Sequence, residues 1–317
     1  MKTSMLLHPD EVGIKQIDRL SKAGVSVLGI HPVGGPKAFE SLKDLILKLK
    51  SSDFKKTLDY AKSKGLEIEY EIHAASYLLP RELFSENPEL FRMNGKGERV
   101  DDYNFCVSNP DALKIVAKRG AELAELLYNS SDNFFFWMDD GKNSSCLCPK
   151  CKKLTPSDQQ TIALNAVLSK IKEKRPLAKM AYLAYFETIT PPTNAKPLDG
   201  IFLEYAPFEK YTAEGENAKE SIKKEQAMLT PLLEFFGTEN SRVLEYWYDN
   251  SLYSKWTKPP KKFILNCNQL NADVEYYINK GFSHISTFAC YLGDDYEALH
   301  GDVDITPFTK AIYKNMK

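Results

Sequence analysis

One pattern recurs along the 317 residues: a strand-sized apolar run, then a polar loop, then an amphipathic stretch with helical periodicity. The apolar runs begin near residues 3, 25, 67, 134, 179, 200, 242 and 284. Helices are expected at 11–23, 38–64, 108–128, 155–174, 218–236, 271–279 and 305–316, while the proline-rich connection after the fifth run lacks one. Eight strands joined by right-handed crossovers close into a barrel. No linker divides the chain, so we expect one α/β domain, a (β/α)8 TIM barrel, over residues 1–317; two smaller doubly wound domains are the alternative.

Composition and local motifs exclude several partners. The formal net charge is -1 and no block of Lys or Arg occurs, which argues against nucleic-acid binding. The Gly34-Gly35-Pro36 turn lacks the spacing and the Lys of a phosphate-binding loop, so nucleotide binding is not expected. No apolar run reaches the length of a membrane span, and the first residues do not form a signal sequence. We therefore expect a cytoplasmic protein without a membrane partner; its oligomeric state is left open.

Acids and histidines gather where the predicted strands end, the edge at which barrel enzymes place their active sites. The fourth run passes directly into Asp139 and Asp140 before Gly141. Glu204 and Glu245 lie within the sixth and seventh runs, where an unpaired charge would be costly, so we expect either a catalytic or an ion-paired role. Other polar and aromatic residues at strand ends are expected to bind substrate: His31, Glu71, His73, Tyr185, Tyr205, Trp247 and Asp249.

Clustered carboxylates without a nucleotide motif are typical of glycoside hydrolysis, in which one acid protonates the leaving oxygen and another serves as nucleophile or activates water. The leading hypothesis is hydrolysis of a small oligosaccharide, with Asp140 as general acid. Glu245 or Glu204 would be the second carboxylate, and Asp139 would orient substrate or water. No cofactor is required for that catalysis. The alternatives are a metal-dependent hydrolase that uses His8, His31 and His73, and a carbohydrate-binding barrel without catalysis.

Five segments resemble a bacterial family defined as a domain of unknown function, which is similar to α-glucuronidase and β-N-acetylhexosaminidase barrels. These segments read YEIHAASYLLPRELF, NFCVSNPDAL, FFFWMDDGKNSSCLCPKCKKLTPSDQ, KMAYLAYFETITPP and VLEYWYDNSLYSKW. The resemblance implies a glycoside-hydrolase-type barrel. The leading hypothesis extends to a substrate that bears a uronic acid or an N-acetylhexosamine. In hexosaminidase-like barrels an Asp–Glu pair follows the fourth strand, the first residue orienting the N-acetyl group and the second donating the proton. Here the pair is Asp139–Asp140, whose second acid is shorter by one methylene.

The loop after the fourth run carries three thiols at C-x-C-x-x-C spacing, Cys146, Cys148 and Cys151. Cys106 belongs to the segment NFCVSNP of the resemblance, and because the third and fourth strands of a barrel are neighbours, it is expected to reach that loop. Four thiolates would make a structural zinc site. Disulfides and free thiols are the alternatives for the same four residues.

Overall fold

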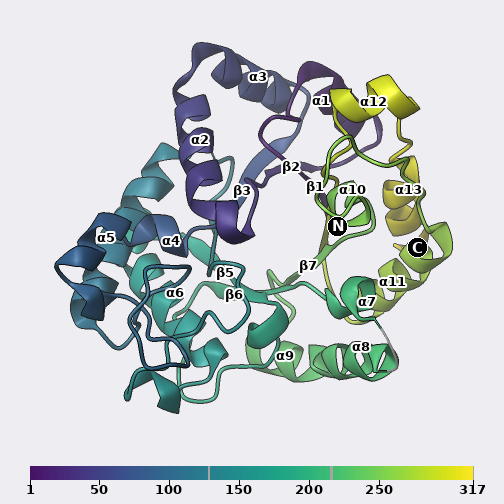
Figure 1. Cartoon of the computed structure of the whole chain (residues 1–317). Helices are drawn as coiled ribbons and strands as arrows, with labels where there is room; N and C mark the ends of the chain where they lie inside the picture. The colour runs from purple at the N-terminus through teal and green to yellow at the C-terminus, as the bar shows by residue number, and fades with distance from the viewer. Residues whose placement is uncertain (128, 215–216, 317) are drawn as a thin grey trace.

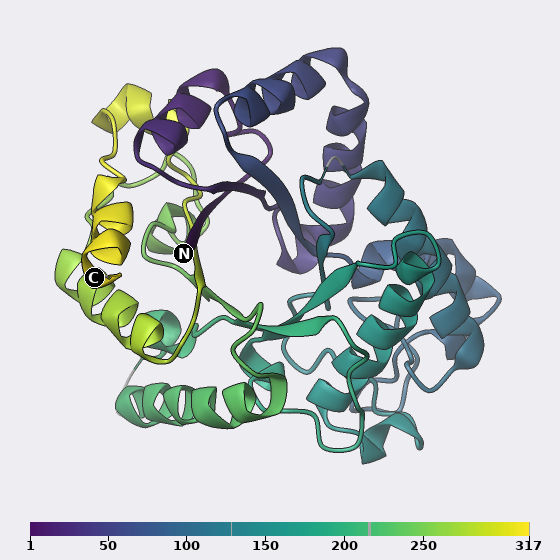
Figure 2. The same cartoon turned by 180° about the vertical axis from the view of Figure 1, so that it is seen from behind.

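The computed structural model describes residues 1–127, 129–214 and 217–316 and contains a closed barrel of eight parallel strands. Each strand pairs with its neighbours in chain order, and β8 closes on β1. Figure 1 shows the chain passing once around the ring, with helices outside and strands within, and Figure 2 shows the same order from behind. The predicted (β/α)8 fold is confirmed. The strands are β1 Lys2–Leu7, β2 Val27–Ile30, β3 Glu67–His73, β4 Asn133–Trp137, β5 Lys179–Ala184, β6 Ile201–Tyr205, β7 Arg242–Glu245 and β8 His284–Phe288.

The helices follow the strands that the apolar pattern predicts. Long helices cover the barrel: α1 Ile14–Lys22, α2 Ala38–Lys50, α3 Ser52–Ser63, α5 Pro110–Leu126, α6 Pro156–Lys172, α8 Ala218–Ala227, α9 Leu229–Phe236, α11 Cys267–Asn279 and α13 Thr306–Asn315. Shorter helical turns shape the loops: η1 Gly35–Lys37, α4 Ala75–Leu78, η2 Arg81–Ser85, η3 Pro88–Leu90, η4 Cys151–Lys153, η5 Phe186–Thr188, α7 Glu209–Thr212, α10 Asn250–Tyr253 and α12 Asp294–His300. Within the described residues, no helix has the length and apolar character needed to cross a bilayer.

Two predicted helices are divided in the structure. The helix expected over 38–64 breaks at Ser51, whose extended backbone ends α2 and whose hydroxyl accepts the backbone N–H of Phe54 (3.2 Å), so that it caps α3. The helix expected over 218–236 divides at Met228 into α8 and α9. A third, expected to reach Tyr128, is described as far as Leu126, and Tyr128 lies outside the described residues.

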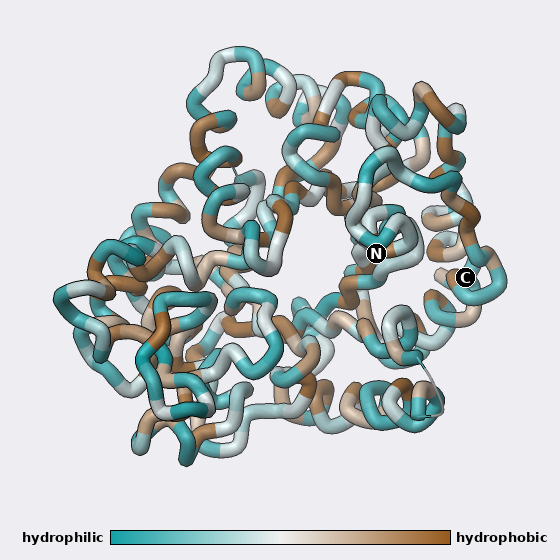
Figure 3. The backbone as a smooth tube through the Cα atoms, viewed as in Figure 1, coloured by the Kyte–Doolittle hydropathy of each residue, from teal (hydrophilic) through white to brown (hydrophobic). Residues whose placement is uncertain are grey.

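Alternation along the strands separates two apolar cores. Side chains that face outward pack beneath the helices in the larger core, which includes Val243, Tyr205 and Trp247. Side chains that face inward form the second core: Leu6, Phe135, Trp137, Ala181, Leu183, Phe202, Ala206, Phe208, Leu244, Tyr246, Phe288 and Cys290. Along the outer helices, brown hydrophobic and teal hydrophilic segments alternate (Figure 3), as expected of helices with one face on the core. The barrel interior is therefore filled with side chains, and a binding site has room only above them, at the strand ends. The single-domain assignment of residues 1–317 stays a prediction.

Candidate active site

A cavity of about 430 Å³ lies at the C-terminal ends of the strands. Seven aromatic side chains line it together with three histidines, two aspartates and one lysine. A small apolar cavity with few polar groups is the usual form of a small-molecule site. Its aromatic and ionisable lining residues are Trp137, Tyr185, Phe208, Tyr246, Trp256, Phe288 and Tyr291, and His8, His31, His73, Asp140, Asp249 and Lys37.

Three histidines from consecutive strands form a row along one wall. The ring centroids of His8 and His31 are 5.9 Å apart, and those of His31 and His73 are 5.8 Å apart. The Nδ1 atoms of these rings lie 2.8, 2.8 and 2.7 Å from the backbone carbonyl oxygens of His31, Glu71 and Met138, respectively. A carbonyl oxygen only accepts, so each Nδ1 carries a proton, and in a neutral ring Nε2 is left as an acceptor.

The central histidine of this row is held neutral. Burial, followed by the neighbouring His73 and His8 rings, places the pKa of His31 well below its ordinary value. The His31 ring is therefore uncharged at neutral pH, and its Nε2 can accept a hydrogen bond from a ligand hydroxyl. The row suits a ligand rich in hydroxyl groups.

Gly34 allows the backbone to pass close to the His73 ring. A methyl group at Gly34 would lie 2.7 Å from Cδ2 and 3.2 Å from Nε2 of His73. Because the ring is also fixed by Met138, we expect Gly34→Ala to lower the free energy of unfolding by about 1–3 kcal/mol through overpacking. Denaturant unfolding measures this. Gly95→Ala is the control, because its methyl group would meet nothing closer than 4.0 Å, and equal stability of both variants would contradict the expected clash.

Two carboxylates reach the cavity, and they come from different strands. Asp140 follows β4 and is half-buried; Asp249 follows β7 and is half-buried. Oδ1 of Asp249 accepts three hydrogen bonds, from Ser251 N (3.0 Å), Ser251 Oγ (2.5 Å) and Leu252 N (3.2 Å). Burial raises the pKa of Asp249, while these donors oppose the rise. The hydrogen bonds fix the orientation of this carboxyl group at the cavity wall.

Tyr185 and Tyr246 each lie near both Asp140 and Asp249. Burial, then the charge and hydrogen bond of Asp140, hold the pKa of Tyr185 well above its ordinary value. Burial and the neighbouring Tyr185, Asp140 and Asp249 do the same for the pKa of Tyr246. Both phenols therefore stay protonated at neutral pH and are available as donors beside the carboxylates.

Asp139 has a different environment from Asp140. Its Oδ2 accepts the backbone N–H of Ser76 (2.8 Å), and its own N–H donates to Oδ1 of Asn104 (2.8 Å). It lines a smaller adjoining cavity together with Asp140, His73 and Tyr185. Burial raises the pKa of Asp139, against the Ser76 hydrogen bond. The strand has ended at Trp137, which is why both acids can lie near the mouth of the barrel.

The expected convergence of Glu245 on the cavity is wrong. Residues alternate along β7, and Leu244 faces inward, so Glu245 faces the outer helices. There it pairs with Lys210, and it accepts hydrogen bonds from Tyr211 (2.6 Å) and Tyr277 (2.5 Å). Of the two roles expected for Glu245, catalytic or ion-paired, the structure shows the ion-paired one.

Two aromatic residues predicted to bind substrate also lie on the outer side. Trp247 donates from Nε1 to Oδ2 of Asp273 (2.9 Å) and packs against Phe308 with ring centroids 6.0 Å apart. Tyr205 packs against Tyr277 with centroids 6.4 Å apart. Both belong to the outer core and neither lines the cavity, so the expectation that they stack on substrate is wrong.

Glu71 and Glu204 are buried inside the barrel below the cavity and do not line it. Trp137, which does line the cavity, donates from Nε1 to Oε2 of Glu204 (2.8 Å). Burial raises the pKa of Glu204 to about 7, against Arg242 and Trp137. Burial and the nearby Glu204 raise the pKa of Glu71 well above its ordinary value. Glu204 supports the floor of the site through Trp137. The burial of Glu71 and Glu204 below the cavity contradicts their expected direct contact with substrate.

The cavity lining includes five residues that the sequence predicted at strand ends to bind or react with substrate: His31, His73, Tyr185, Asp140 and Asp249. Further lining residues that were not predicted to bind substrate in the leading hypothesis are His8, Trp137 and Tyr246. Alternation along β7 could have predicted Tyr246 at the cavity. Arg242 faces inward, and every second side chain after it, Leu244 and Tyr246, faces the same way. Phe208 and Tyr291 come from loops and have no comparable signal.

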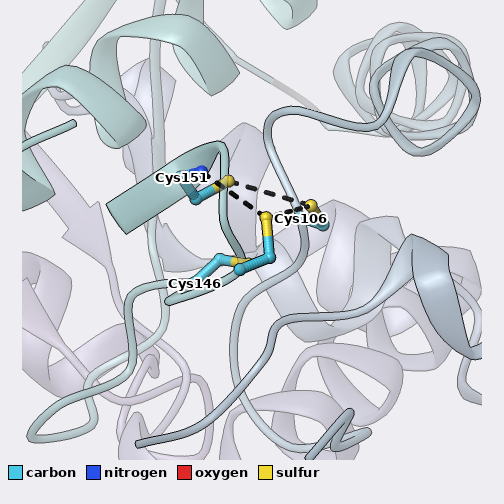
Figure 4. Close-up of side chains that lie close together, drawn as sticks. Cys106, Cys146 and Cys151 are labelled. Atoms are coloured by element: carbon cyan, nitrogen blue, oxygen red, sulfur yellow. Dashed lines mark hydrogen bonds between the residues drawn. The ribbon is translucent and has the colours of Figure 1, made fainter. Parts of the chain in front are cut away.

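The four cysteines form a separate cluster away from the large cavity. Cys106, Cys146, Cys148 and Cys151 are buried, and their sulfur atoms all lie within 4.8 Å of one another. Figure 4 shows Cys106, Cys146 and Cys151 close together, from two different loops. Throughout the described residues, this is the one group of three or more metal-ligating side chains whose ligand atoms come close enough to share an ion. The three histidines of the cavity are thus not arranged as the ligands of a catalytic metal.

Comparison with known proteins gives a family and a fold. A family model, the domain of unknown function DUF4838, matches residues 45–294. Among curated proteins no match was found. Solved structures with the same fold include a β-galactosidase from the psychrophilic Marinomonas ef1 (12% identity, TM-score 0.55), whose alignment covers 90% of this chain and 54% of that one.

Two further structures give the same result. A β-galactosidase from the Antarctic haloarchaeon Halorubrum lacusprofundi is 10% identical with a TM-score of 0.55, covering 100% of this chain and 58% of that one. A tri-modular GH5 (subfamily 4) endo-β-1,4-glucanase from Bacillus licheniformis is 14% identical with a TM-score of 0.54, covering 98% and 59%. The chain thus spans less than two thirds of these proteins. At such identities the likeness shows the barrel fold, which in all three is that of a glycoside hydrolase.

Proposed function

This chain belongs to the DUF4838 family, and we propose that it hydrolyses a glycosidic bond in a small oligosaccharide. One observation carries the proposal: Asp140 after β4 and Asp249 after β7 share an aromatic-walled cavity at the mouth of the barrel. Two carboxylates beside a sugar-sized cavity are what glycoside hydrolysis requires. The similar barrels of glycoside hydrolases support the same reading.

We assign the general acid to Asp140, whose carboxyl lies beside the Tyr185 hydroxyl. It would donate a proton to the leaving oxygen as the glycosidic bond breaks. Asp249 replaces Glu245 and Glu204 as the second carboxylate. Its fixed orientation, set by Ser251 and Leu252, suits attack on the anomeric carbon or activation of water. The separation of the two carboxyl groups during reaction decides whether the configuration is retained.

Recognition would use the other walls. The Nε2 atoms of the histidine row accept hydrogen bonds from sugar hydroxyls, and rings such as Tyr246 and Trp256 pack against the apolar faces of the sugar. Lys37 is the lysine of the lining, and it would pair with the carboxylate of a uronic acid. Among the expected substrates, Lys37 therefore favours a uronic acid over an N-acetylhexosamine.

A panel of aryl glycosides tests the proposal with the unaltered protein. We expect the unaltered protein to release the aryl group from at least one glycoside, the glucuronide first. The Asp140→Asn, Asp249→Asn double variant should release none, and it controls for contaminating hydrolases. Calorimetric titration with the matching free sugars separates the alternatives. Binding without turnover would identify a non-catalytic carbohydrate-binding barrel. The absence of both binding and turnover would contradict a carbohydrate site.

A further inference from the structure

The cysteine cluster has the dimensions of a tetrahedral metal site. Zinc binds thiolate sulfur at about 2.3 Å, so the sulfur atoms at the corners of its tetrahedron are about 3.8 Å apart. The Sγ atom of Cys106 lies 3.7 Å from that of Cys148 and 3.8 Å from that of Cys151. One thiol equidistant from two others is not the arrangement of a disulfide, which pairs sulfur atoms two by two. The spacing matches shared ligation of one ion.

Donors around the sulfur atoms suit thiolates. The backbone N–H of Met93 points at Sγ of Cys146 (3.3 Å), and that of Cys151 points at Sγ of Cys148 (3.4 Å). The Arg99 guanidinium lies 3.9 Å from Sγ of Cys146. Four thiolates around a divalent ion keep a net negative charge, which N–H groups and a neighbouring cation stabilise.

We propose that Cys106, Cys146, Cys148 and Cys151 bind one zinc ion, with four protein ligands and no position open for a substrate. Soft thiolate ligands in tetrahedral geometry select zinc or iron, and oxygen-preferring ions such as magnesium are excluded. None of the four residues lines the large cavity, which places the ion outside the reacting centre. The ion is structural.

The proposed ion joins two loops that lie beside the active site, where Asn104 of one and Asp139 of the other line the smaller adjoining cavity. Cys106 belongs to the segment between β3 and α5, and the other three belong to the segment between β4 and α6. Gln159 of α6 holds the second segment, accepting from Cys146 N (2.9 Å) and donating to the carbonyl oxygens of Cys146 (3.0 Å) and Cys151 (3.2 Å).

The same two segments meet again at the turn that carries Asp139 and Asp140. Asn104, two residues before Cys106, accepts the backbone N–H of Asp139 (2.8 Å) and donates to Oγ of Ser144 (2.9 Å). Zinc would therefore hold Asn104 in place beneath the Asp139–Asp140 turn. Removing the ion would loosen this turn without removing any group that touches substrate.

Metal analysis of the purified full chain tests the site directly. We expect about one zinc per chain by mass spectrometry, and an X-ray absorption spectrum with four sulfur neighbours at about 2.3 Å. Cobalt taken up in place of zinc should show the intense visible and near-ultraviolet bands of a tetrahedral tetrathiolate. Less than a tenth of an equivalent of zinc after reconstitution, iron in its place, or a shell dominated by nitrogen or oxygen would each overturn the proposal.

Variants localise the ion. Cys148→Ser should lose at least nine tenths of the zinc, whereas Cys267→Ser, at an exposed cysteine outside the cluster, should keep it. If Cys148→Ser does not fold, the absorption spectrum of the unaltered protein decides alone. Zinc content does not depend on hydrolysis, so an inactive protein with one tetrathiolate zinc would overturn the proposed function alone, and an active protein without zinc would overturn this site alone.

Discussion

Asp140→Asn is expected to lower kcat/KM for an aryl glycoside with a poor leaving group by about 100- to 10,000-fold, the usual contribution of a general acid. Asn has nearly the shape of Asp but has no proton to give to the leaving oxygen. A substrate whose leaving group departs without protonation should lose much less. Asp249→Asn should instead impair both substrates alike, because the second carboxylate acts on the sugar and not on the leaving group.

The control for this experiment is Asp295→Asn. Asp295 is exposed after β8, accepts a hydrogen bond from Lys258 (2.7 Å) and does not line the cavity, so its loss should leave kcat/KM unchanged. Circular dichroism and thermal unfolding show whether each variant keeps its fold. A folded Asp140→Asn variant with full activity on the poor leaving group would remove Asp140 from the role of acid.

Arg242→Met is expected to cost about 3–5 kcal/mol of unfolding free energy, because it leaves a buried carboxylate without its cation. Nη1 of Arg242 lies 2.7 Å from Oε2 of Glu69, and both side chains are almost fully buried. The guanidinium also lies over the Phe135 ring, 4.3 Å from its centroid. Glu71 and Glu204 lie close by and add further carboxyl groups to the same region. Denaturant unfolding at neutral pH measures the loss.

The pH dependence of stability provides a second measurement of this ion pair. Burial alone would raise the pKa of Glu69, but Arg242 outweighs burial and lowers it from 4.5 to about 2. A folded-state pKa below the unfolded value stabilises the protein above about pH 4.5, and that stabilisation is lost as pH falls toward 2. In Arg242→Met this contribution should disappear.

Lys2→Met is the matched control, because Lys2 and Glu67 form an exposed pair at the same end of the barrel. It should cost less than about 1 kcal/mol. A loss that small in Arg242→Met would show that the buried pair contributes little to the stability of the barrel.

Much of the fold follows from local pattern. Apolar runs of strand length, and start signals such as Thr155-Pro156-Ser157-Asp158, predicted strands and helices at the right places. The Thr155 hydroxyl indeed accepts the N–H of Asp158 (3.0 Å), and the Asp158 carboxylate accepts that of Thr155 (3.0 Å). These signals involve residues a few positions apart, so they can be read without knowledge of the rest of the chain. The break at Ser51 was missed although four polar residues, 50–53, separate Leu49 from Phe54 and include the serine that caps α3.

The candidate site was predictable only in part. The barrel rule brings strand ends together, and it placed Asp140, Asp249, His31, His73 and Tyr185 at the cavity. It does not say which way a side chain points. Glu204 and Glu245 both lie in apolar runs, yet one faces inward below Trp137 and the other outward to Lys210.

The sequence by itself determined the order of strands and helices, and with it the barrel, because hydrophobic periodicity is a local property of the chain. Only the tertiary structure decided which acids share the cavity and which are neutralised elsewhere. Closure of the barrel sets the inward and outward face of every strand at once, and it pairs Glu69 with Arg242 across 173 positions of sequence. Such pairings depend on where distant strands meet, which no local pattern specifies.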